Sequence, residues 1–123
     1  MKILTAKEIQ EEIYRIMERL DEIILPPKDR ETGLYAQRRG NREFMEEKKK
    51  GIIAQEKLKQ EGSNPQQETK ALASEAYSKF IWDMTTAIGL SYQVEAEKAL
   101  LEKKLDCYRT LLSYEKMMNE IAH

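Results

Sequence analysis

The chain has 123 residues, of which 35% are charged and 41% hydrophobic, and its formal net charge is −1. This length fits one small domain, and this composition is typical of helix-rich and coiled-coil proteins rather than β-sandwiches or disordered tails. The near-neutral charge predicts no whole-chain attraction to nucleic acid or to membranes. One cysteine excludes an internal disulfide, and no apolar run is long enough for a membrane-spanning helix or a signal peptide. We therefore expect a cytoplasmic protein.

The first expected element is a helix within residues 1–27. Thr5 and Glu8 have the spacing of a capping box, in which two side chains satisfy unpaired amides at a helix start. Apolar residues then recur at steps of three and four, which predicts one buried face. Pro26 and Pro27 end the helix because they lack an amide donor. The apolar face consists of Ile9, Ile13, Ile16, Met17, Leu20, Ile23 and Ile24.

Residues 28–40 are expected to form a basic connector, followed by a second helix over residues 41–61 that Asn41 would cap. The apolar pattern of this second helix is weaker than that of the first. The sequence GSNP at 62–65 predicts a turn. In this turn Asn64 would cap the next helix and Pro65 would occupy its first position.

The last expected element is one long helix over residues 65–121, which continues through Gly89. It carries a heptad stripe, a row of residues spaced four and three apart: Ala73, Tyr77, Phe80, Met84, Ala87, Ser91, Val94, Lys98, Leu101, Leu105, Tyr108 and Leu112. The first two helices leave little margin for covering such a stripe, so we expect a homo-oligomer through it. A compact monomeric bundle with a bend at Gly89 is the alternative. The oligomer contacts would come from Tyr77, Phe80, Met84, Val94, Leu101, Leu105, Tyr108 and Leu112.

The fold class expected from these elements is all-α: an elongated helical bundle or coiled coil with one long C-terminal helix. No nucleophile, metal-ligand, phosphate-binding or dinucleotide motif occurs, and His123 is the only histidine. We therefore predict no catalytic residues, no metal site and no cofactor. Trp82 lies off the heptad stripe and is expected to pack on another helix, with an exposed partner anchor as the alternative. Cys107 is expected to be partly buried. Met117 and Met118 are expected to be adaptable packing residues, with a partner groove as the alternative.

Charge is unevenly distributed along the chain. Residues 28–59 carry 10 basic and 6 acidic groups, whereas the segments before and after are net acidic. Basic side chains can neutralise phosphates while aromatic rings stack on bases, so this segment is a nucleic-acid candidate. Interleaved glutamates and three consecutive lysines favour the other interpretation, a hinge and a solvated helix. The candidate residues are Arg38, Arg39, Arg42, Lys48, Lys49, Lys50, Tyr35 and Phe44.

Residues 42–118 resemble a group of small helical proteins encoded by tailed phages, often among recombination and replication genes. The resemblance rests on EKKKGIIAQEKL, on ETKALASEAYSKF and on a long helix ending in LDCYRTLLSYEKM. It implies an accessory protein that acts in the host cytoplasm beside annealing or replication machinery, or on a host factor. It implies no catalytic residues.

Three functional hypotheses follow from the residues and the resemblance. The first is a non-enzymatic helical interaction protein that self-associates and engages a phage or host protein. The second is a nucleic-acid-binding accessory protein that uses residues 28–59. The third is an inhibitor of a host defence or replication protein. The heptad stripe favours the first hypothesis, and the uneven charge favours the second.

Overall fold

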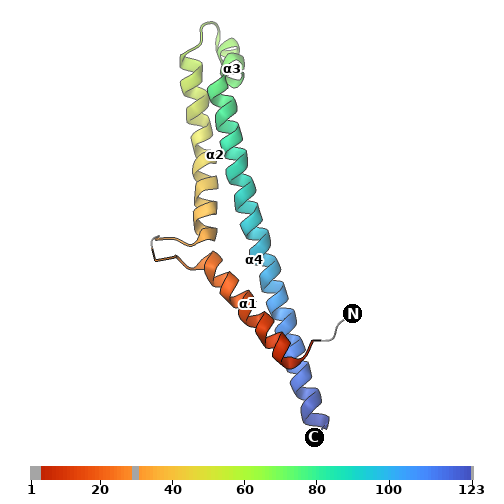
Figure 1. The fold of residues 1–123 in the computed structure, drawn as a ribbon. Helices are drawn as coiled ribbons and strands as arrows, with labels where there is room; N and C mark the ends of the chain where they lie inside the picture. Colours follow the sequence, from red (N-terminus) through yellow and green to blue (C-terminus); the bar gives the residue numbers. More distant parts are fainter. Residues whose placement is uncertain (1–3, 29–30, 123) are drawn as a thin grey trace. The chain divides into compact units, whose positions relative to one another are not determined.

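The computed structural model describes residues 4–28 and 31–122. In these residues it contains α1 (Ala6–Ile24), α2 (Leu34–Leu58), α3 (Asn64–Leu72) and α4 (Glu75–Ala122), and no strands (Figure 1). The described part is 86% helical and forms a helical bundle with one long C-terminal helix, which confirms the expected fold class. His123, residues 1–3 of the predicted first helix and residues 29 and 30 of the predicted connector lie outside the described residues.

The chain divides into two compact units. Unit 1 comprises residues 1–35 and 94–123, and unit 2 comprises residues 36–93. Unit 1 therefore contains α1 and the second half of α4. Unit 2 contains most of α2, all of α3 and the first half of α4.

Local sequence signals set both ends of α1 in unit 1. The Thr5 side chain accepts a hydrogen bond from the Glu8 backbone N–H at 3.2 Å, which confirms the predicted N-cap. At the other end Leu25 is extended, with φ −84° and ψ 143°. The proline that follows disfavours helical angles at Leu25, so α1 ends at Ile24.

The core of unit 1 lies between α1 and the second half of α4, which run antiparallel (Figure 1). Leu105 of α4 is buried among α1 residues, and further residues of the heptad stripe pack against the same cluster. Full burial of one such side chain stabilises a fold by about 1.5–3 kcal/mol. Of the predicted apolar face of α1, Met17 and Ile24 are exposed; the buried members are Ile9, Ile13, Ile16, Leu20 and Ile23.

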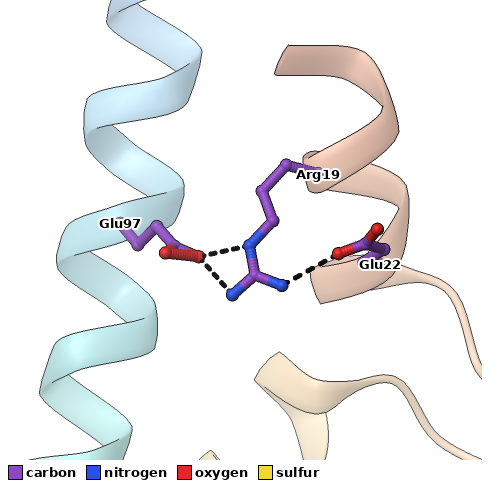
Figure 2. Close-up of polar contacts among 3 residues, drawn as sticks. All are labelled: Arg19, Glu22 and Glu97. Atoms are coloured by element: carbon purple, nitrogen blue, oxygen red, sulfur yellow. Dashed lines mark hydrogen bonds and ion pairs between the residues drawn. The ribbon is translucent and has the colours of Figure 1, made fainter. Parts of the chain in front are cut away.

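A charged cluster also joins α1 to α4 in unit 1, and Figure 2 shows Arg19 between two glutamates. The Arg19 guanidinium donates to Glu22 at 3.0 Å and to Glu97 at 2.8 Å. These hydrogen bonds raise the pKa of Arg19 above its ordinary value, first through Glu22 and then through Glu97. Because the side chains are largely exposed, such a cluster contributes only about 0–1 kcal/mol to stability.

Unit 2 contains a hairpin in which α2 and the first half of α4 run antiparallel (Figure 1). The covered face of α2 repeats at steps of three and four and is largely charged. Within it Glu56 is buried, and its carboxylate accepts a hydrogen bond from Lys59 Nζ at 3.0 Å. On α4 the buried residues of this unit are Phe80, Ala87 and Ser91. This face consists of Arg38, Arg42, Met45, Lys49, Ile52 and Glu56, and the neighbouring Ile53 and Lys57 are also half-buried.

The predicted boundary between connector and second helix is wrong. α2 starts at Leu34, so residues 34–40 are helical and Asn41 lies inside the helix instead of capping it. A glycine such as Gly40 costs only about 1 kcal/mol inside a helix. Leu34 and Tyr35 are half-buried, so packing of the first turn helps to offset that cost.

The predicted continuous helix over residues 65–121 is also interrupted. α3 ends at Leu72 and α4 starts at Glu75. Between them the Ser74 hydroxyl donates to the Ala71 carbonyl at 2.8 Å and accepts from the Tyr77 backbone N–H at 3.2 Å. A serine hydroxyl bonded in this way competes with the helical ladder and caps the next helix. From Glu75 onward, α4 continues through Gly89 as predicted.

The turn before α3 is present, but its cap lies one residue earlier than predicted. Ser63 is the N-cap, with φ −68° and ψ 163°, and Asn64 is the first residue of α3. The Ser63 backbone N–H donates to the Gln66 side-chain oxygen at 3.0 Å. Pro65 lies in the first turn, as expected for a residue without an amide donor.

Candidate interaction surface

The residues of the heptad stripe that lie on α4 are buried or half-buried within the chain, whereas Ala73 is exposed and is the C-cap of α3. Phe80 and Leu105 are buried, and the other six residues predicted to form an oligomer interface are half-buried. In unit 1 Leu101, Leu105, Tyr108 and Leu112 pack with α1. A second copy could reach this part of the stripe only by displacing α1. Self-association stays a prediction, and in unit 1 an intact chain would need another surface for it.

The residues predicted to contact nucleic acid lie in both units. Tyr35 belongs to unit 1, where the Lys98 ammonium lies 5.4 Å from the centre of its ring. Lys98 also donates to Glu102 at 2.7 Å, and this hydrogen bond raises the pKa of Lys98 above its ordinary value. The Tyr35 ring is therefore half-buried beside a cation of its own chain.

In unit 2 several candidate cations are paired with carboxylates one helical turn away. Arg39 donates to Glu43 at 3.2 Å, and Arg42 lies 3.9 Å from Glu46. The Arg42 guanidinium also lies 5.1 Å from the ring centre of Tyr92, and only 16% of its side chain is exposed. These contacts reduce the positive charge that these arginines present to a phosphate.

The remaining candidates lie on different sides of α2. Lys49 and Arg38 are half-buried on the face turned toward α4, whereas Lys48 lies 5.8 Å from the ring centre of the exposed Phe44. Lys50 shares a shallow hollow with glutamates at positions 43, 46 and 47. The fold thus spreads these candidate residues over several sides of α2, and Arg38, Arg42 and Lys49 share the half-buried side. A nucleic-acid contact stays a prediction.

A DNA titration separates these interpretations. We expect only weak binding to labelled single- and double-stranded DNA at about 50 mM salt, because intrachain carboxylates accompany the cations. Replacing Arg38 and Arg39 together with alanine should lower the affinity for DNA no more than replacing Lys103 and Lys104 with alanine does. Tight binding that weakens steeply at about 200 mM salt, and is lost only from the arginine variant, would contradict this expectation.

The C-terminal part of α4 carries a second apolar row, which we call the outer stripe: Cys107, Leu111, Tyr114, Met118 and Ile121. Its members follow one another at steps of four, three, four and three, and all are exposed. Tyr114 is 58% and Ile121 is 72% exposed. Each member directly precedes a position of the heptad register, so at 3.6 residues per turn this row lies about 100° around the helix from the heptad stripe. It therefore stays uncovered while the heptad stripe packs on α1.

The surroundings of the outer stripe leave it accessible within unit 1. The last turns of α4 extend beyond the start of α1 (Figure 1). Near Cys107 the surface forms a shallow, mainly apolar hollow lined by Asp106, Cys107, Thr110 and Leu111. The Thr110 hydroxyl donates to the Asp106 carbonyl at 2.9 Å, so its methyl group is directed away from that bond. The result is an apolar strip on an otherwise polar helix surface.

Three expectations from the sequence are wrong at exposed positions. Cys107 is exposed instead of partly buried, because it lies on the outer stripe beside the heptad residue Tyr108. Trp82 is 74% exposed and does not pack into unit 2. Met117 and Met118 are exposed rather than packed.

Leu111, Tyr114 and Ile121 are surface candidates that were not predicted from the sequence. The signal was present as a second row of four-three spacing in residues 107–121. This second row was not recognised because the heptad stripe by itself already explains the apolar periodicity of the helix.

Within residues 4–28 and 31–122, no helix combines the length and apolar character of a bilayer-spanning segment. In the same ranges, no three His, Cys, Asp or Glu side chains are grouped so that they could share a metal ion. Comparison of the chain with protein-family models, with curated proteins and with solved structures gave no match.

Proposed function

We propose that this chain is a non-enzymatic helical interaction protein, which self-associates and engages a protein partner through the C-terminal part of α4. The observation that carries the proposal is the exposed outer stripe. The heptad stripe already stabilises the fold, whereas the outer stripe contributes little burial to the isolated chain. Its regular spacing is that of a helix-docking surface.

Physical chemistry favours a partner for such a stripe. Contiguous exposed apolar side chains on a soluble protein mark interaction sites more often than isolated ones do. Tyrosine and methionine suit this role, because both bury large areas and tyrosine keeps a polar end for water or a hydrogen bond. The resemblance of residues 42–118 to phage accessory proteins supports a phage or host protein as the partner.

Site-specific photocrosslinking tests this proposal. The Tyr114→p-benzoylphenylalanine variant, expressed in bacteria and irradiated, should form covalent adducts with a bound protein. The matched control is Lys116→p-benzoylphenylalanine, because Lys116 is exposed on the same turns of α4 but lies about 160° away from Tyr114 around the helix. Adducts at Tyr114 and not at Lys116 support the proposal, and the adduct mass shows whether the partner is a second copy. Equal yields, or no adducts at either position, contradict it.

A further inference from the structure

We infer that the outer stripe is the interface of a parallel, in-register homodimer, in which α4 of one copy lies along α4 of the other. This inference rests on the proposed function and specifies its partner. The stripe has a spacing of four and three, so two copies of it can form alternating coiled-coil layers. Because α1 packs on a face about 100° away, the pairing leaves the core of unit 1 intact.

The identity of the layers favours the parallel orientation. In a parallel, in-register pair, every outer-stripe residue faces its own copy and all five layers are apolar. In an antiparallel pair centred on the stripe, Cys107 faces Met118 and Leu111 faces Tyr114, but Ile121 then faces Lys104. A lysine opposite Ile121 leaves the most exposed residue of the stripe without an apolar partner. The parallel pair therefore removes more apolar surface from water.

The flanking residues are compatible with this orientation. In the parallel pair, residues that flank the apolar layers of one copy lie next to flanking residues of the other copy. Lys103 of one copy then lies next to Tyr108 of the other, and Thr110 lies next to Glu115. Neither combination places like charges together. Lys104, which precedes Cys107 in the same register, faces its own copy in the parallel pair, and this like-charge contact at the edge of the apolar layers lowers the affinity of the dimer. Met117 continues the apolar edge near the end of the helix.

The area of the stripe also fits a second copy. If each of the five side chains buries on the order of 100 Å², the two copies together remove roughly 1,000 Å² from water, the lower limit of a specific interface. Micromolar rather than nanomolar dissociation is the expectation for an interface of this size without a large central anchor. The dimer should therefore dissociate on dilution.

The experiment combines analytical ultracentrifugation with cysteine crosslinking of the full chain. In the parallel dimer the two Cys107 thiols face each other, so a short bis-maleimide should link them under reducing conditions. In the antiparallel pair they would be about 16 Å apart along the helix, out of reach of the same reagent. The antiparallel pair would instead be linked by the reagent in a Met118→Cys variant, through Cys107 and the new cysteine. The negative control is Cys107→Ser combined with Lys116→Cys, which places the thiol away from the stripe.

The expected result is a concentration-dependent dimer whose Cys107 thiols crosslink in the native sequence. The Leu111→Glu variant should weaken dimerisation at least tenfold, while its circular dichroism spectrum and monomer melting curve stay unchanged. A monomer at all concentrations, or a dimer that crosslinks only in the Met118→Cys variant, overturns the inference. A monomer that still forms Tyr114 adducts with another protein overturns the homodimer and the proposed self-association, and leaves the proposed engagement of a protein partner standing.

Discussion

Replacing Leu105 with aspartate is expected to unfold unit 1. Leu105 is 9% exposed and lies in the cluster formed by Ile9, Ile13, Ile16 and Leu20 of α1. The change removes a buried leucine, which costs about 2–5 kcal/mol for truncation alone. It also places a carboxylate among apolar side chains, and an unpaired buried charge adds several kcal/mol. The total is comparable to the whole stability of a small domain, about 5–15 kcal/mol.

The measurement is urea unfolding followed by far-ultraviolet circular dichroism, with Leu100→Asp as the matched control. Leu100 lies on the same helix in the same unit, but it is 53% exposed. The control substitution should change the free energy of unfolding by less than about 0.5 kcal/mol. A similar unfolding midpoint for Leu105→Asp and the unaltered chain would show that α1 does not pack on this part of α4.

Replacing Gly33 with alanine is expected to disrupt the junction between α1 and α2. A β-carbon at Gly33 would overlap the carbonyl oxygen of Ile24 and lie 2.6 Å from the carbonyl carbon of that residue. Both atoms belong to the backbone, so no side-chain rotation can relieve the overlap. The end of α1 or the start of α2 must move, and we expect a loss of more than about 2 kcal/mol of stability. Thermal unfolding measures this loss.

Gly40→Ala is the control for this prediction. Gly40 lies inside α2, and a β-carbon there would have no atom within 4 Å. Alanine is the better helix former by about 1 kcal/mol, so this substitution should raise the melting temperature. The same glycine-to-alanine change is thus expected to lower the melting temperature at Gly33 and to raise it at Gly40. A tolerated Gly33→Ala substitution would mean that the chain does not pass this close to the end of α1.

The two surfaces of α4 in unit 1 have different roles in these predictions. The heptad stripe stabilises the monomer, so substitution at Leu105 should act on folding before any association is measured. The outer stripe lies apart from that core, so substitution at Leu111 should act on association with little effect on folding. Because the two stripes are separate, a Leu111 variant that loses partner binding can be interpreted as having lost a surface contact and not its fold.

The sequence by itself determined the helical class, the ends of α1 and the two faces that the core uses. Thr5 and Pro26 set the limits of α1 because capping and the loss of an amide donor act within one turn. The spacing of Ile13 and Leu105 identified buried positions, since a side chain's place on a helix follows directly from the residue number. Such signals are local and need no knowledge of the partner helix.

Only the tertiary structure decided what covers each face. A four-three spacing predicts that a stripe packs on another helix, but α1 and a second copy would require the same spacing. The sequence therefore could not decide that Leu105 packs on α1. The break at Ser74 and the early start of α2 at Leu34 likewise depend on weak local preferences. Differences of about 1 kcal/mol in helix propensity are smaller than those from packing. The exposure of Tyr114 and Ile121 followed only when the position of α1 was known, because burial is a property of neighbours and not of the residue itself.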